Sequence, residues 1–209
     1  APAAGDVDAW LGDTSATPVD HSTILDGLIL RGGAGWNGLF LAGSSPLVRH
    51  CRFDGFPMYA AFVSGVASPR LESCVFSNLA ETAVFGAGGA SLQLKDCEFT
   101  RCGLGGLRAA LQGYNSRFVV ESCLFRGNGG PAVEMSQGSD LQLSGSRIET
   151  NHAGGLIVRA QATAGLKAPD GPLVWRTQPP IAPEGKLAAW RVGQLGTKIR
   201  ADLDLAPSA

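Results

Sequence analysis

The sequence predicts an all-β solenoid, a fold in which short strands stack coil upon coil. A short phrase returns four times between residues 46 and 158, and then once more in altered form. Cys51, Cys74 and Cys97 mark it at intervals of 23 residues, Cys123 follows after 26, and Ser146 restores the step of 23. A fixed period of this size indicates units that cannot bury their apolar side alone and must stack on their neighbours.

Each unit is made of short strands rather than helices. Runs of two to four residues rich in Val, Leu and Phe alternate with Gly, Ser, Asn and Pro, which is typical of strands and turns. When the units are aligned on their final aromatic, one column is apolar throughout. It contains Leu30, Phe53, Phe76, Phe99, Phe125 and Ile148. With three short strands per turn, the sequence predicts a right-handed parallel β-helix of about six short coils.

The repeat also carries a family resemblance. The pattern Ser-x-Cys-x-Phe, followed by Asn, Gly-Gly and an aliphatic pair, resembles the parallel β-helix repeats of the pectate-lyase-like superfamily. The best copies lie at residues 122–135 and 146–158, and residues 23–33 resemble an early coil. The resemblance covers roughly residues 20–160 and implies the fold. It does not select an activity, because the superfamily includes lyases, hydrolases, epimerases, tailspikes, adhesins and non-catalytic scaffolds.

The chain divides into three regions. Residues 1–22 are irregular and predict an N-terminal cap over the first core layer. Residues 23–160 form the parallel β-helix, and residues 161–209, rich in Ala, Gly and Pro, predict a non-repeat C-terminal cap or arm along the solenoid. Short strands are expected within this arm around Trp175, around Trp190 and over residues 198–203.

The composition limits the function classes. A net charge of −1 without a basic run argues against a nucleic-acid binder, and no apolar stretch approaches the length of a transmembrane segment. Residues 1–5 are compatible with the start of a mature chain after removal of a signal peptide and with a boundary inside a longer chain. A secreted, periplasmic or cell-surface location is therefore favoured, and the oligomeric state is left open.

Four of the five cysteines occupy one inward column. Side chains stacked on neighbouring parallel strands lie about 4.8 Å apart and point the same way, which does not suit a disulfide. We therefore expect free thiols buried as small apolar groups. Cys102, at a turn position shared with Asn128 and Asn151, is also expected to be structural.

Two outward columns of polar residues are interpreted as structural. One alternates in charge and predicts a solvated charge ladder of Arg49, Glu72, Lys95 and Glu121. The next lies at a bend and contains His50, Ser73, Asp96 and Ser122. Its order does not suit a catalytic triad, in which His lies between the nucleophile and the acid. The histidines fall on different coils, so neither a metal site nor a cofactor is predicted.

The outward column of another strand is the main candidate surface. By alignment it contains Phe40, Phe62, Phe85, Arg108, Glu134 and Ile157. This alignment places the three extra residues of the fourth coil near residues 113–115. Arg108 and Glu134 then lie on adjacent coils and are expected to pair. A single carboxylate is too few for glycosidase chemistry, which uses two.

An exposed strip of three phenylalanines is unusual for a monomer, so we expect either a binding partner or another segment of the chain to cover it. One interpretation is that the C-terminal arm covers the strip with Trp175 or Trp190. The others are a surface that binds a partner protein and a platform on which sugar rings stack. The sugar platform is weakened by the scarcity of polar groups beside it to hold hydroxyls.

The leading functional interpretation is a non-catalytic scaffold or binding module, part of a larger bacterial-type surface or assembly protein, with a protein or a polysaccharide as partner. Its candidate contacts are Phe40, Phe62, Phe85 and Arg108. The alternative, which the resemblance implies, is a polysaccharide lyase or glycoside hydrolase with Glu134, Arg108 and Asp96 as first suspects. A third class is a subunit that stacks end to end, because an open solenoid end has unpaired strand edges.

Overall fold

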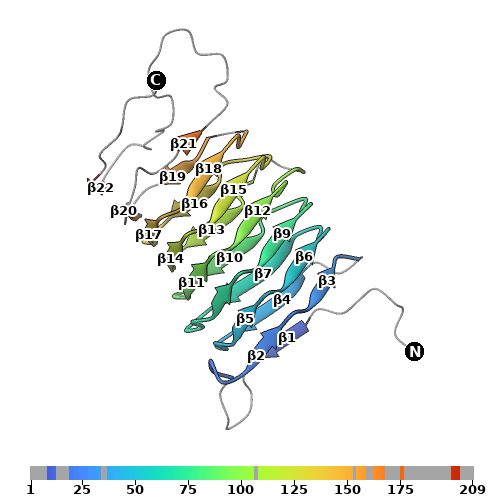
Figure 1. Cartoon of the computed structure of the whole chain (residues 1–209). Helices are drawn as coiled ribbons and strands as arrows, with labels where there is room; N and C mark the ends of the chain where they lie inside the picture. The colour runs from blue at the N-terminus through green and yellow to red at the C-terminus, as the bar shows by residue number, and fades with distance from the viewer. Residues whose placement is uncertain are drawn as a thin grey trace, which may run out of the picture.

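The chain winds into a right-handed parallel β-solenoid, as predicted (Figure 1). The computed structural model describes residues 9–12, 19–33, 37–105, 108–152, 154–158, 162–167, 175–176 and 199–202. Within these residues all regular elements are β-strands, and each full coil contributes one strand to each of three sheets. We call these sheets A, B and C, and within each coil the chain passes from sheet B to sheet C and then to sheet A.

Each sheet consists of parallel strands from successive coils. Sheet A contains β1 (Ala9–Gly12), β4 (Asn37–Ala42), β7 (Tyr59–Ser64), β10 (Val84–Ala87), β13 (Leu111–Tyr114), β16 (Val133–Ser136) and β19 (Leu156–Val158). Sheet B contains β2 (Ile24–Asp26), β5 (Leu47–Arg49), β8 (Arg70–Glu72), β11 (Ser91–Lys95), β14 (Arg117–Glu121), β17 (Asp140–Ser144), β20 (Thr163–Lys167) and β22 (Ile199–Asp202). Sheet C contains β3 (Ile29–Arg31), β6 (Arg52–Asp54), β9 (Val75–Ser77), β12 (Glu98–Thr100), β15 (Leu124–Arg126), β18 (Arg147–Glu149) and β21 (Trp175–Arg176).

Strands outside the central repeat extend the same sheets. β1 pairs in parallel with β4, so the segment expected to be irregular contributes a strand to sheet A. Beyond residue 160, β20 continues sheet B, β21 pairs with β18 and β22 pairs with β20. Strands therefore occur near Trp175 and over residues 199–202 as expected, whereas the strand expected around Trp190 lies outside the described residues. The region boundaries and the arm's position along the solenoid stay predictions.

The core is built from stacked columns of like residues. The four phenylalanines of the final aromatic column are buried, and successive ring centroids lie 5.0, 4.8 and 4.6 Å apart with planes within 11° of parallel. They are Phe53, Phe76, Phe99 and Phe125. At the first coil, Leu30 is only partly buried and packs against this core. The predicted inward column is confirmed.

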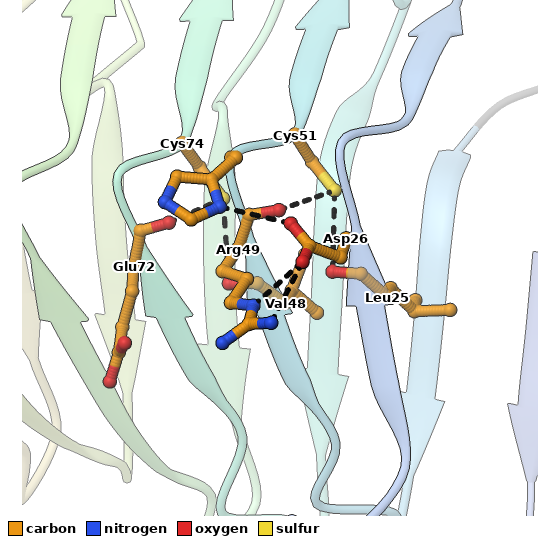
Figure 2. Close-up of polar contacts among 8 residues, drawn as sticks. Leu25, Asp26, Val48, Arg49, Cys51, Glu72 and Cys74 are labelled. Carbon is orange, nitrogen blue, oxygen red and sulfur yellow. Dashed lines mark hydrogen bonds and ion pairs between the residues drawn. The ribbon is translucent and has the colours of Figure 1, made fainter.

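The cysteine column consists of free, buried thiols, as predicted. Each Sγ–H donates to the backbone carbonyl two residues earlier at 3.2–3.4 Å, and Figure 2 shows these contacts for Cys51 and Cys74. Ser146 continues the column, since its Oγ donates to the Ser144 carbonyl at 3.1 Å. The column thus satisfies its own polar groups without a disulfide.

A second inward column satisfies buried polar groups at the bend after sheet C. Asn151 Nδ2 donates to the Phe125 carbonyl, and Asn128 Nδ2 donates to Asn151 Oδ1 at 2.7 Å. Asn128 Oδ1 accepts the backbone N–H of Cys102 at 2.9 Å. Burial raises the pKa of the Cys102 thiol to about 12. Cys102 thus has the structural role expected of it, because its backbone N–H is a partner for the buried side-chain amide of Asn128.

The bend between sheets B and C uses one left-handed residue per coil. These residues are Gly27, His50, Ser73, Asp96, Ser122 and Gly145, with φ between 51° and 68°. A glycine adopts this conformation without strain, whereas a residue with a Cβ does not. The prediction that the polar column lies at a bend is confirmed.

Truncation of a central ring should destabilise the fold strongly. Phe99 stacks between Phe76 and Phe125, so Phe99→Ala leaves a closed cavity and should lower the free energy of unfolding by about 3–5 kcal/mol. Urea denaturation measures it. Phe62→Ala removes a ring from the partly exposed outer face and should cost clearly less. Equal losses in the two variants would contradict this account of the core.

Relief of backbone strain should stabilise the fold. At Ser73, with φ 51°, Ser73→Gly removes a left-handed penalty of roughly 1–2 kcal/mol but adds about 0.5–1 kcal/mol of chain entropy to the unfolded state. The free energy of unfolding should therefore rise by about 0.5–1 kcal/mol, as thermal and urea denaturation would measure. The matched control, Gly145→Ala at φ 57°, should lower it. A destabilised Ser73→Gly variant would refute the argument.

Candidate functional site

The outer face of sheet A carries a row of aromatic rings that ends at a polar residue. Strand register places seven described residues in one column of sheet A. Trp10 of β1 pairs with Phe40 at its start, and the column continues through Phe62, Phe85, Gln112, Glu134 and Ile157. The expectation that Arg108 belongs to this column is wrong, because Phe85 pairs with Gln112.

The misplacement of Arg108 follows from the position of the insertion. Val84 comes 8 residues after Phe76, but its register partner Leu111 comes 12 residues after Phe99. The extra residues thus lie in residues 101–110, which we call the coil-four loop, and not near residues 113–115. Gly113 is instead an inward residue of β13, where a Cβ would lie 2.5 Å from the terminal methyl of Met135.

The aromatic row is partly exposed rather than bare or fully covered. Phe40 and Phe62 have centroids 5.2 Å apart with planes 1° from parallel, and Phe62 and Phe85 follow at 5.5 Å and 26°. The rings therefore cover one another's faces along the solenoid and turn their edges outward. Whether the C-terminal arm contributes a cover stays a prediction, because Trp190 and the side chain of Trp175 lie outside what the structure describes.

A pocket of about 590 Å³ lies beside the end of this row. Its lining comes from three successive coils and consists of Pro57, Met58, Tyr59, Glu81, Thr82, Phe85, Arg108 and Gln112. One wall is aromatic, because Tyr59 stacks on Phe85 with ring centroids 5.2 Å apart. A volume of this size falls within the range of roughly 300–1,000 Å³ that small-molecule sites occupy.

The coil-four loop contributes Arg108 to the polar wall of the pocket. Backbone N–H groups of Gly103, Leu104 and Gly105 donate to carbonyls of residues 79–81 at 2.7–3.2 Å. These bonds hold residues 103–105 against the preceding coil. Arg108 Nε then lies 3.2 Å from Glu81 Oε2. The expected pair between Arg108 and Glu134 is therefore replaced by a pair with Glu81.

Tyr59 lies in the electric field of that ion pair. Burial raises the pKa of its phenol, the Glu81 carboxylate raises it further, and the Arg108 guanidinium opposes the rise. At neutral pH the hydroxyl is protonated and available to donate and accept hydrogen bonds. Glu81, Gln112 and Tyr59 were not recognised in the sequence, because none of them belongs to a repeated column that reads as functional.

The other suspected residues are placed away from this pocket's lining. Asp96 lies at the bend between sheets B and C, and Glu134 lies one strand beyond Gln112 in the outward column. His50 Nδ1 is 2.9 Å from the Asp26 carboxylate, which also accepts from Arg49 (Figure 2). His50 thus pairs with an acid on the preceding coil, which supports the structural interpretation of its column.

The charge ladder on sheet B is confirmed. Arg49 pairs in register with Glu72, Glu72 with Lys95, and Lys95 with Glu121. Asp26 extends the alternation by one coil, with its carboxylate 2.9 Å from the Arg49 guanidinium. Hydrogen bonds from His50 and Arg49 hold the pKa of Asp26 below its usual value.

Neither a metal site nor a membrane-spanning helix occurs in the described part of the chain. No group of three or more His, Cys, Asp or Glu residues is placed there to hold a metal ion. The same residues include no helix with the length and apolarity needed to cross a membrane.

The electrostatics of the pocket can be tested through Tyr59. A Tyr114→Phe background leaves Tyr59 as the single tyrosine, so the absorbance of phenolate against pH measures its pKa directly. Glu81→Gln should lower that pKa because it removes a nearby negative charge, and Arg108→Gln should raise it. A Tyr59 pKa that responds to neither substitution would mean that the ion pair does not face the ring.

The family comparison agrees with the fold. A family model described as "Right handed beta helix region" matches residues 11–167, well over half of the chain and the whole of the pocket lining. No curated protein and no solved structure matches the chain. The comparison therefore supports the architecture and names no ligand or reaction.

Proposed function

The chain belongs to the right-handed β-helix family, and we propose that it is a non-catalytic module that binds saccharides on the outer face of sheet A. One observation carries the proposal: stacked Tyr59 and Phe85 share a pocket with the ion pair of Glu81 and Arg108 and the amide of Gln112. Specific small-molecule sites combine such apolar walls with a few convergent polar groups.

The two walls match the two kinds of surface that a sugar presents. The C–H groups of a pyranose pack on aromatic rings, which supply large apolar contact areas. Its hydroxyls require both donors and acceptors, and here the guanidinium donates, the carboxylate accepts and the amide does both. From the sequence, a sugar platform was disfavoured because few polar groups were expected beside the phenylalanines. This objection does not apply to the pocket, because Glu81 and Gln112 line it together with Phe85.

The same lining favours binding without bond cleavage. Its described residues include one carboxylate, that of Glu81, which is engaged with Arg108. Glycosidases commonly use two carboxyl groups, roughly 5–9.5 Å apart, and one of them must be free to move a proton or attack carbon. Neither Glu134 nor Asp96 belongs to the described lining. The pocket therefore has the groups that orient a sugar but not a second acid for hydrolysis.

Affinity electrophoresis through gels that contain soluble neutral or acidic polysaccharides tests the proposal. At least one polysaccharide should retard the chain. Phe85→Ala should weaken this retardation about tenfold or more, because loss of a buried ring contact costs roughly 1.5–3 kcal/mol. Phe40→Ala is the matched control. It removes a ring from the same row but outside the pocket lining, and should leave the affinity within about twofold.

Two results would contradict the proposal. If no polysaccharide in the panel retards the chain, or if Phe85→Ala binds as well as the parent, the pocket is not a saccharide site. Retention of a protein partner lost in both Phe40→Ala and Phe85→Ala would indicate a protein-binding face instead. Release of reducing ends or unsaturated sugars, abolished by Glu81→Gln or Glu134→Gln, would support the carbohydrate-active enzyme.

A further inference from the structure

We infer that the pocket takes one neutral pyranose ring, stacked on Phe85 where a further aromatic ring would continue the row on sheet A. The inference rests on the proposed function and adds two properties to it, the position of the sugar and its charge. The position follows from strand register, and the charge follows from the ion pair in the pocket wall.

The aromatic row stops one strand short of a place where another ring would fit. Phe40, Phe62 and Phe85 repeat at ring separations of 5.2 and 5.5 Å, and the next residue in register is Gln112. The described rings that contact Phe85 are those of Phe62 and Tyr59, and both come from β7 on the preceding coil. The opposite side of the Phe85 ring, toward β13, is therefore the side left for a ligand.

Local contacts keep this place open. Gln112 Oε1 accepts a hydrogen bond from the buried Thr82 hydroxyl at 3.3 Å, which draws the amide back toward the preceding coil. The coil-four loop turns sharply at Gly103, where φ is +74° and a Cβ would collide with the Arg108 carbonyl. Beyond this turn, Arg108 lies in the pocket wall beside Glu81. The pocket volume of about 590 Å³ leaves room for a sugar ring beside Phe85 and these polar residues.

Among the residues that the structure describes, the pocket wall carries no net charge. Its lining includes one cation, Arg108, and one anion, Glu81, and the two face each other at 3.2 Å. A sugar carboxylate entering this space would lose water without gaining an unpaired cation, which is unfavourable. Neutral hydroxyls can donate to the carboxylate and accept from the guanidinium together. The wall therefore selects a neutral hexose over a uronate.

Matched sugars test the charge. Methyl β-glucoside and methyl β-glucuronide differ at C6 alone, and so do methyl β-galactoside and methyl β-galacturonide. Each sugar can be titrated into the full chain and its binding followed by NMR. The neutral member of the pair that binds should do so about tenfold or more tightly. Glu81→Gln frees the guanidinium and should shift the preference toward the uronate, whereas Arg108→Gln should strengthen the preference for the neutral sugar.

A ring supplied by mutation tests the position. Gln112→Phe should continue the aromatic row and occupy the sugar's place, so binding of the neutral sugar should fall about tenfold or more. Thermal denaturation should show a folded variant with an unchanged or higher Tm. Gln112→Leu removes the amide without supplying a ring and is the control, so its binding should fall clearly less than that of Gln112→Phe.

The outcomes separate this inference from the proposed function. Equal or tighter binding of the uronate by the parent chain overturns the neutral preference, and full affinity in a folded Gln112→Phe variant overturns the stacking position. Both results leave a saccharide-binding module in place. Failure of the parent chain to bind these sugars and every polysaccharide in the panel overturns the proposed function and this inference with it.

Discussion

The structure depends on parallel, in-register pairing between each coil and the next. Because residues pair one for one across neighbouring strands, each side chain lies beside the residue at the same place in the next coil. Uncharged groups can meet their own kind, as the stacked phenylalanines and the bonded amides of Asn128 and Asn151 do. Like charges would repel one another in such a column, so the sign of the charge alternates from Arg49 to Glu72 to Lys95 along sheet B.

The same constraint explains how one coil can differ and create a site. Inward columns hold the sheets together, so β13 stays in register with β10 although the loop before it is longer. The extra residues remain outside the pairing, where the coil-four loop bonds to residues 79–81 and brings Arg108 to Glu81. A single change in an outward column, from Phe85 to Gln112, then leaves a polar pocket at the end of an aromatic row.

The sequence predicts most of the fold because each column is sampled in several coils. Averaging over the repeats identifies the buried phenylalanines, the thiols and the bends, but it cannot identify a feature present in one coil. Arg108 was misplaced because the insertion lies among glycines that carry no periodic signal. Alignment of Gly86 with Gly113, which pair in register, would have revealed the shift. Glu81 precedes a strand and meets Arg108 only through the fold, so its role required the structure.

The cysteine column has a consequence for how the solenoid opens. Burial raises the pKa of the Cys51 thiol, and all four thiols of the column are at most 1% exposed. Thiols in this state do not react until the surrounding structure separates. Because the four lie on four successive coils, the rate at which each is alkylated reports the opening of its own coil. The chain therefore contains an internal set of probes for whether a solenoid frays from its ends or unfolds as a unit.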